Sequence, residues 1–306
     1  MDVIISLLNH KKNKRVKDST LGTYEKHLYR FEREFPWIPE ELSLILDYLA
    51  GFTGETGRYK RNQQDLLNML YKHATRFFRM AKNPMLGLER PQVTERPIKT
   101  LSLQMVKLLN DTPKTLAERV VLDMLLGHGW RQVEVRRILA GDVVDIHGGS
   151  MLCRGKERQE MAPILPETEE RLKELTQGLS LSDHVFLSNR IYRGARQALG
   201  EDGMSQMIVR LYARAGIKEM TGHDLRRSFA TIVAAASNDE LLAMRLLRDK
   251  VPGQSDRYIH FPLSRLAEAL SRYSPLRIIE DKETGSGTAP EPACLSGGDG
   301  GDPLFP

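Results

Sequence analysis

The stretch HDLRRSFAT, residues 223–231, is the most informative part of the sequence for both fold and function. It combines core residues and charged residues in one short segment. The pattern predicts a helix whose buried face carries Leu225 and Phe229. His223 and Arg226 are three residues apart and therefore share another face. A helix N-terminus attracts anions through its free backbone N–H groups. The stretch thus indicates an anion-binding site at the start of a buried helix.

Three other clusters carry side chains of complementary chemistry. In GWRQVE, Glu134 follows Arg131 by three residues, a spacing that lets the carboxylate hold the guanidinium. In RGKER, Lys156 lies at the predicted tip of a β-hairpin. In SDRYIH, Tyr258 provides a hydroxyl. Each cluster alone also fits an ordinary role: a surface ion pair, a basic turn or a packed aromatic ring.

Together, the four clusters predict a site that cuts a phosphodiester. Arg131 and Arg226 can hold both non-bridging oxygens of one phosphate, because a guanidinium is planar and permanently charged. Lys156 can give a proton to the departing oxygen, His223 can assist proton transfer, and Tyr258 can attack phosphorus and hold it covalently. These cations can stabilise the transition state, and the sequence has no acidic cluster typical of a two-metal nuclease, so we expect no metal ion.

The order Arg, Lys, His-x-x-Arg, Tyr, with its flanking residues, resembles the tyrosine recombinase (phage integrase) family. The most specific match, to the family's HxLRH[ST]FAT box, is HDLRRSFAT. The family's first arginine box resembles LLGHGWRQVEVRRILAGDVV, its lysine hairpin resembles MLCRGKERQEMAPI, and its nucleophile segment resembles RYIHFPLSRLAEAL. The resemblance covers roughly residues 15–275.

The resemblance implies a DNA strand transferase with assigned roles. Three side chains would bind the scissile phosphate, namely Arg131, His223 and Arg226. Glu134 would brace the arginine site, and Lys156 would be the general acid toward the 5′-oxygen. Tyr258 would form a 3′-phosphotyrosyl link, which a 5′-hydroxyl of the partner strand then attacks. Because the ester stores the bond energy, family members need neither ATP nor metal, and we expect no cofactor.

The resemblance also implies partners. Relatives act as four protomers on two DNA sites and pass through a Holliday junction. We therefore expect double-stranded DNA as substrate and a tetramer on DNA, as for the integrase of a mobile element. We further expect a helix over 263–272 to dock on a neighbouring protomer.

One position departs from the family pattern. Relatives usually have His or Trp nine residues before the tyrosine, where this chain has Asp249. An ionised carboxylate repels phosphate and donates no hydrogen bond to it. Three explanations stay open: Asp249 holds Arg226 or Arg248, Lys250 supplies the missing donor, or the enzyme cleaves slowly. The sequence predicts that Asp249→His keeps or raises activity.

The fold class follows from the helical periodicity, the short strands predicted over 143–164 and the resemblance. We predict a two-domain DNA clamp, mainly α with a small antiparallel β-sheet. Its expected parts are a helical core-binding domain at 1–85, a linker at 86–99, an α+β catalytic domain at 100–278 and a disordered acidic tail at 279–306. The linker is assigned from its prolines, and the tail from its Gly, Pro and Ser content.

Charge is unevenly spread along the 306 residues. The net charge is +5, but residues 281–306 carry five acids and one base, so residues 1–280 sum to +9. A basic body favours a polyanion such as nucleic acid. We expect a mobile basic arm at 11–17 (KKNKRVK). A predicted helix over 62–82 has a basic stripe that either lies along a DNA backbone or is a solvated face; its members are Lys72, Arg76 and Arg79.

The cysteine content and the hydropathy of the sequence indicate the cellular compartment. Two cysteines, Cys153 and Cys294, form neither a disulfide framework nor a metal-ligand spacing. The sequence contains no run of roughly 18 apolar residues, the length of a membrane helix. We therefore expect a cytoplasmic, nucleoid-associated protein with no membrane partner.

Two other functions fit the same residues. A topoisomerase IB-like enzyme would cut and reseal one strand without exchanging partners. A catalytically lapsed DNA-binding protein would keep the fold, and Asp249 is the one departure that favours it. Comparing plasmid relaxation with two-site exchange distinguishes the topoisomerase-like enzyme from a recombinase. A covalent DNA adduct at Tyr258 distinguishes an enzyme from the lapsed DNA-binding protein.

Overall fold

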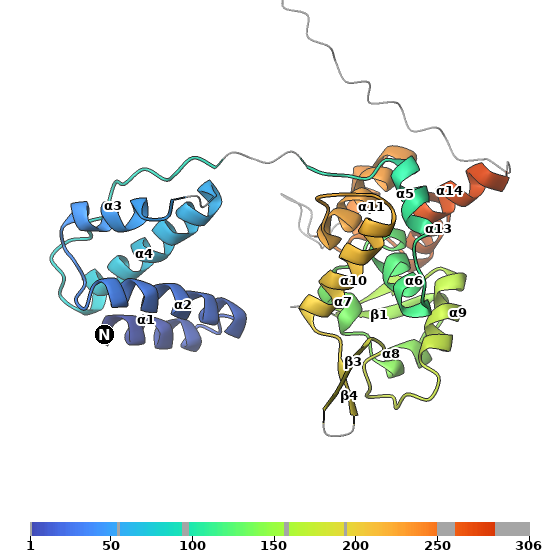
Figure 1. Cartoon of the computed structure of the whole chain (residues 1–306), viewed down its shortest axis with the longest axis horizontal. Coiled ribbons are helices and arrows are strands. Elements are labelled where there is room, and N and C mark those ends of the chain that lie inside the picture. Colours follow the sequence, from blue (N-terminus) through green and yellow to red (C-terminus); the bar gives the residue numbers. More distant parts are fainter. Residues whose placement is uncertain are drawn as a thin grey trace, which may run out of the picture. The chain divides into compact units, whose positions relative to one another are not determined.

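The computed structural model describes residues 2–53, 56–93, 98–155, 159–192, 195–249 and 261–284. The chain divides into two compact units, Met1–Pro97 (unit 1) and Ile98–Pro306 (unit 2) (Figure 1). The described part of unit 1 is helical. Unit 2 combines helices with two small antiparallel sheets, so the predicted fold class is confirmed.

The described part of unit 1 contains four helices: α1 (Asp2–Asn13), α2 (Asp18–Glu34), α3 (Leu42–Ala50) and α4 (Gly57–Phe77). Their apolar faces meet in one core, as expected for amphipathic helices. Leu28 and Leu70 are fully buried at its centre together with Tyr71. The Tyr71 hydroxyl donates to the Pro39 carbonyl at 2.7 Å, so the phenol is satisfied inside the core.

Two expectations for unit 1 are wrong. The predicted mobile arm at 11–17 begins inside α1, because the apolar face of that helix packs into the core and orders the chain as far as Asn13. The helix predicted over 62–82 runs over 57–77 instead. It begins earlier because the Thr56 side chain accepts a hydrogen bond from the Tyr59 N–H. It ends before Arg79, whose φ of 57° lies outside the helical region.

Unit 2 has a larger set of elements. In chain order, they are α5 (Leu103–Asn110), α6 (Leu116–Leu122), the π-helix η1 (Asp123–Gly127), α7 (Gln132–Arg136), α8 (Ala140–Val144), β1 (Ser150–Arg154), β2 (Gln159–Pro163), α9 (Pro166–Leu175), β3 (Leu187–Tyr192), β4 (Ala195–Ala198), α10 (Glu201–Arg214), α11 (Gly222–Ser237), α12 (Glu240–Leu246), α13 (Leu263–Tyr273) and α14 (Pro275–Thr284).

Helix α11 carries the HDLRRSFAT stretch and contributes to two packed clusters of unit 2. Leu225 packs into the larger cluster, and Phe229 and Val233 pack into the second, with α12 and α13. The Ser228 hydroxyl donates to the Asp224 carbonyl at 2.7 Å and accepts from the Leu101 N–H at 2.8 Å. This packing fixes the rotation of α11 and so sets where its charged face lies, with His223 exposed and Arg226 buried.

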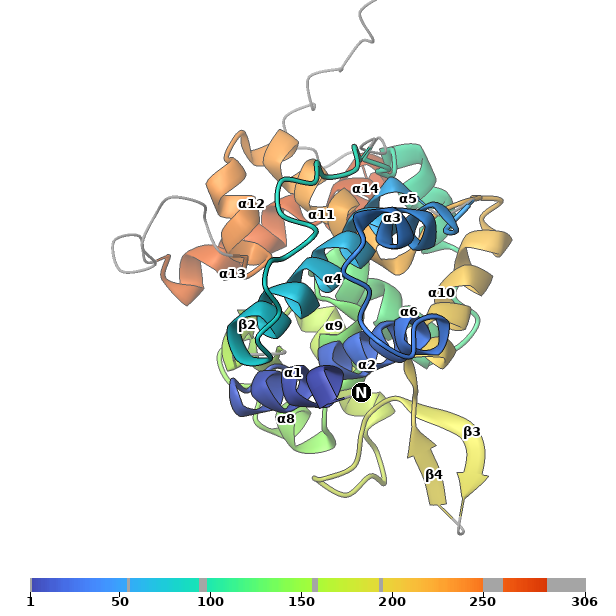
Figure 2. The same ribbon diagram turned by 90° about the vertical axis from the view of Figure 1, so that its left-hand side faces the viewer.

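The two sheets are hairpins. Strands β1 and β2 pair from Ser150↔Pro163 to Arg154↔Gln159, as the lysine-hairpin pattern predicts. Strands β3 and β4 form a second hairpin that extends from the body of unit 2 in both views (Figures 1 and 2). The sequence pattern does not predict this second hairpin. A projecting hairpin buries little apolar surface, and Ile191 on β3 is 71% exposed, so the strand lacks the alternating pattern that marks a half-buried strand.

The C-terminal helices bear on two further expectations, of which one is wrong. The predicted disordered tail begins at 279, but α14 continues to Thr284 because Leu276, Ile278 and Ile279 are buried against unit 2; residues 285–306 lie outside the described part. The helix expected to dock on a neighbouring protomer is α13. Its buried face packs on its own chain, where Leu270 lies with residues of α11 and α12, and its docking on a neighbouring protomer stays a prediction.

Candidate active site

Arg131 is held at the start of α7 by the turn before it. The π-helix η1 ends at Gly127, and Gly129 adopts φ 65°, a left-handed conformation that glycine tolerates. A Cβ at Gly129 would lie 2.5 Å from a ring carbon of Phe229, so the turn also requires the absence of a side chain. Trp130 is fully buried, which leaves Arg131 at the edge of the core.

Glu134 accepts two hydrogen bonds from Arg131. Its Oε2 accepts from the Arg131 backbone N–H at 2.8 Å, and its Oε1 accepts from Arg131 Nη1 at 2.7 Å. The carboxylate is buried, and burial alone would raise its pKa. The positive charge of Arg248 and the hydrogen bonds from Arg131 outweigh burial and hold the pKa of Glu134 below its ordinary value. Glu134 is therefore ionised at neutral pH.

The side chain of Arg226 extends from α11 toward the turn that precedes Arg131. Its Nη1 donates to the Gly129 carbonyl at 2.5 Å, and its Nη2 donates to the Leu247 carbonyl at 2.7 Å. Burial lowers the pKa of Arg226 to about 10, which still leaves the guanidinium protonated at neutral pH. The two backbone carbonyls thus fix a buried cation beside Arg131.

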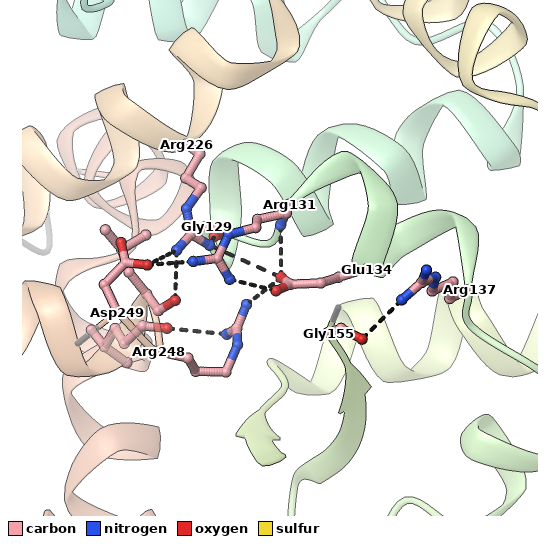
Figure 3. Close-up of polar contacts among 10 residues, drawn as sticks. Gly129, Arg131, Glu134, Arg137, Gly155, Arg226, Arg248 and Asp249 are labelled. Atoms are coloured by element: carbon pink, nitrogen blue, oxygen red, sulfur yellow. Dashed lines mark hydrogen bonds and ion pairs between the residues drawn. The ribbon is translucent and has the colours of Figure 1, made fainter. Parts of the chain in front are cut away.

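Asp249 joins the two arginines. Its Oδ1 accepts a hydrogen bond from Arg226 Nη2 at 3.0 Å and another from Arg131 Nη2 (Figure 3). Of the explanations open for this residue, the contact with Arg226 is present, and Arg131 is an additional partner. Lys250 lies outside the described residues. The side chains of Arg131 and Asp249 are 40% and 38% exposed, so their contact faces solvent, whereas Arg226 lies beneath it.

Arg248 is a third arginine of the cluster, which the sequence indicates only as a candidate partner of Asp249. Its Nη2 donates to Glu134 Oε2 at 2.8 Å. Three guanidiniums and two carboxylates therefore meet here and leave one positive charge in excess. The contact joins residues 114 positions apart, so no local spacing could have revealed it.

His223 is the second residue of α11 and is exposed. Partial desolvation, followed by the positive charges of Arg227 and Arg226, lowers its pKa below the ordinary value of 6.5. The imidazole is therefore mainly neutral at neutral pH. Asp224 caps the helix by accepting from the Thr221 N–H at 2.8 Å. The geometry presents a neutral nitrogen base close to the arginines.

The two remaining predicted catalytic residues, Lys156 and Tyr258, lie outside the described residues. The strand that leads to Lys156 is anchored, because Arg137 Nη1 donates to the carbonyl of Gly155 at 2.8 Å (Figure 3). Arg137 is the C-cap of α7, the helix that begins after Arg131. The hairpin and the arginine site are therefore tied to the same short helix.

The predicted basic stripe is only partly formed. Lys72 and Arg76 are exposed on α4 of unit 1, whereas Arg79 is exposed beyond the end of the helix. The Arg76 guanidinium lies 5.3 Å from the ring centre of Phe77. The regular spacing predicted for the three cations is therefore lost at Arg79.

Comparison with known proteins identifies the family. The model of the Phage integrase family matches residues 99–260, more than half of the chain. The tyrosine recombinase XerC of Actinobacillus pleuropneumoniae serotype 7 (strain AP76) is 23% identical over 222 residues, which cover 68% of this chain and 70% of that protein. The chain belongs to the phage integrase family, and the predicted resemblance is confirmed.

Solved structures show the same fold. A lambda integrase dimer bound to a COC′ core site superposes with a TM-score of 0.67 at 15% identity, covering 85% of this chain and 98% of that one. A lambda integrase tetramer bound to a Holliday junction gives 0.65 at 17% identity, covering 84% and 79%. No helix in the described stretches has the length and hydropathy needed to cross a membrane.

Proposed function

We propose that this tyrosine recombinase cuts and rejoins DNA through a 3′-phosphotyrosyl intermediate at Tyr258, without metal or ATP. Arg131 and Arg226 bind the scissile phosphate, and His223 assists from the start of α11. Lys156 protonates the 5′-oxygen that leaves. The family assignment supports the reaction class, and the arrangement of the arginines supports the roles given to them.

The convergence of Arg131 and Arg226 on a single carboxylate oxygen of Asp249 carries this proposal. Two guanidiniums that share one anionic oxygen have the geometry needed to share a phosphate oxygen. Their contact with Asp249 lies on the solvent side of the cluster, from which DNA must arrive. Asp249 then serves as the counter-ion of the free enzyme, and the phosphate takes its place.

The excess positive charge explains how such a site works. Attack of a phenol on a phosphodiester places additional negative charge on the equatorial oxygens of the transition state. Preorganised guanidiniums stabilise that charge with little rearrangement, because Glu134 and two backbone carbonyls already hold them. A neutral His223 can accept or relay the phenolic proton.

Double-stranded DNA is the proposed substrate, and a tetramer on two DNA sites is the proposed assembly. Lambda integrase structures on a core site and on a Holliday junction support both. We propose a helical DNA-binding domain at 1–85 and a catalytic domain at 100–278. Such an enzyme would act in the cytoplasm at the nucleoid.

A covalent-adduct experiment tests the function. The protein is incubated with nicked duplexes that include the DNA flanking its gene, and adducts that resist denaturing detergent are measured. We expect wild type to form an adduct and Tyr258→Phe to form none, because the phenolic oxygen is the nucleophile. Three control variants should keep the adduct: Tyr192→Phe, Tyr212→Phe and Tyr273→Phe.

The outcome also separates the alternative functions. No adduct at any protein concentration, with normal DNA binding, would identify a binding protein and reject the proposal. Given an adduct, exchange between two sites supports a recombinase. Relaxation of a supercoiled plasmid without exchange would indicate a topoisomerase-like enzyme.

A further inference from the structure

Arg248 lies beside the proposed phosphate-binding arginines but is directed into the protein (Figure 3). Its side chain is 8% exposed, and its Nη2 donates to Glu134 Oε2 at 2.8 Å. Its Nη1 donates to the Leu246 carbonyl at 3.1 Å, and its guanidinium lies 5.1 Å from the ring centre of the buried Trp130. These contacts are with protein groups, so a direct contact with DNA does not explain the residue.

The backbone at Arg248 is left-handed, with φ 59°. A residue with a Cβ adopts this conformation only where its surroundings hold it. The turn is closed by a hydrogen bond from the Asp249 N–H to the Met244 carbonyl at 3.1 Å. As a result, two consecutive side chains reach one site, Arg248 toward Glu134 and Asp249 toward Arg131.

Glu134 connects Arg248 to Arg131. One carboxylate oxygen, Oε1, accepts from the Arg131 guanidinium, and the other, Oε2, accepts from both the Arg131 N–H and Arg248. A carboxylate with both oxygens engaged cannot rotate without breaking a charge-assisted bond. Arg248 therefore fixes the orientation of the group that orients Arg131.

We propose that Arg248 is a positioning residue for DNA cleavage, which acts through Glu134 to keep the Arg131 guanidinium aimed at the scissile phosphate. The proposal rests on the proposed function of the site. It assigns to Arg248 two effects on Glu134: it keeps the carboxylate ionised in a buried place, and it holds its orientation.

The charges around Glu134 define the expected pH dependence. Four groups face it: the Arg131 guanidinium from the start of α7, Arg248 from the turn after α12, Arg226 from α11 at 4.0 Å, and the Cys153 thiol from β1, whose pKa burial raises to about 12. Beyond the arginines lies Asp249. Arg248 is the largest of the influences that lower the pKa of Glu134. Without Arg248, burial raises that pKa, and Glu134 takes up a proton at a higher pH.

The experiment compares Arg248→Met with wild type. Single-turnover adduct formation is measured from pH 5 to 8, on the nicked duplex that gives the adduct with wild type. We expect Arg248→Met to be about 10- to 100-fold slower at neutral pH, the loss expected for one charge-assisted hydrogen bond. We also expect its rate to fall at a higher pH than that of wild type as pH decreases, because burial then raises the pKa of Glu134.

Two variants control for structure. Arg248→Lys keeps the positive charge, so we expect it to restore the pH profile, though not the full rate. Arg272→Met removes an exposed guanidinium that also lies over an aromatic ring, that of Tyr273, and we expect wild-type rates. A normal rate and pH profile in folded Arg248→Met would overturn the proposal. An equal loss of rate at every pH in Arg248→Met and Arg248→Lys would also overturn the proposal.

A second measurement does not depend on catalysis. The pKa of the Glu134 carboxyl is followed by carbon NMR in wild type and in Arg248→Met, with Glu134→Gln assigning the signal. His223 titrates in both proteins, and this measurement separates its effect from that of Glu134. A raised pKa in the variant supports the effect of Arg248 on Glu134 even if no DNA adduct forms, in which case the proposed function fails and not this contact. An unchanged pKa together with an active wild type rejects the inference and leaves the proposed function standing.

Discussion

Asp249 places a carboxylate oxygen on both arginines of the proposed phosphate site. DNA must displace this carboxylate before its phosphate can bind. We expect Asp249→Asn and Asp249→His to form the adduct as fast as wild type or up to about 10-fold faster, because each removes the competing charge. Histidine also adds an N–H donor. Adduct formation on one nicked duplex measures both rates.

The same substitutions should lower stability. Loss of the carboxylate leaves Arg131 and Arg226 without a shared anion, so the free energy of unfolding of Asp249→Asn should fall by about 1–2 kcal/mol in urea titrations. Asp145→Asn, at an exposed position at the end of α8, is the control and should leave both properties unchanged. Cleavage more than about 10-fold slower in both Asp249 variants would mean that Asp249 orients the arginines on DNA.

Local spacing explains which site residues the sequence reveals. Arg131 and Glu134 are three residues apart on one short helix, and His223 and Arg226 share a face for the same reason. The contact of Asp249 with Arg131 joins positions 118 residues apart. Its geometry depends on the left-handed turn at Arg248, which no residue preference predicts. The departure at Asp249 is thus visible in the sequence, but its partners are not.

At the scale of elements, the turn between η1 and α7 aligns the site. Gly129→Ala would place a Cβ 2.5 Å from Phe229 and 2.8 Å from Leu247, at a φ that alanine adopts poorly. We expect the free energy of unfolding to fall by about 2–4 kcal/mol. Cleavage should fall as well, because the Gly129 carbonyl that accepts from Arg226 would shift. Thermal unfolding and adduct formation measure the two effects.

Gly87→Ala separates strain from steric clash. Gly87 also has a positive φ, 84°, but a Cβ there would meet nothing within 4 Å. We expect it to cost only about 1 kcal/mol of stability, the cost of the backbone conformation alone, with cleavage unchanged. If Gly87→Ala and Gly129→Ala lower the free energy of unfolding equally, backbone conformation, and not packing against Phe229, is the reason that Gly129 must be glycine.

Elements are predictable where their own side chains enter a core. Helix α11 follows from its apolar spacing, and the β1–β2 hairpin follows from its pattern around Gly155. The π-helix η1 is fully buried, so it has no exposed face to create a period. Helix α4 ends earlier than predicted, because backbone conformation and not Pro84 terminates it. Burial and tertiary contacts therefore decide what sequence periodicity leaves open.

At the scale of the whole molecule, the basic body of the chain predicts binding driven by phosphate contacts. Lys72, Arg76 and Arg79 are exposed on unit 1, and alanine at each should weaken binding to unrelated DNA sequences by similar factors. Each lost phosphate contact should reduce the slope of log affinity against log salt concentration by about 0.9. Fluorescence anisotropy at several salt concentrations measures this slope.

The observed end of α4 sharpens the prediction. Lys72 and Arg76 are one helical turn apart, so they can follow one DNA strand, and their double alanine variant should lower the slope by about twice the single value. Arg79 lies beyond the helix and should act independently of them. Arg33→Ala changes an exposed arginine in the last turn of α2 and is the matched control. An unchanged slope in the double variant would mean that this face of α4 is only solvated, because counterion release cannot occur without phosphate contact.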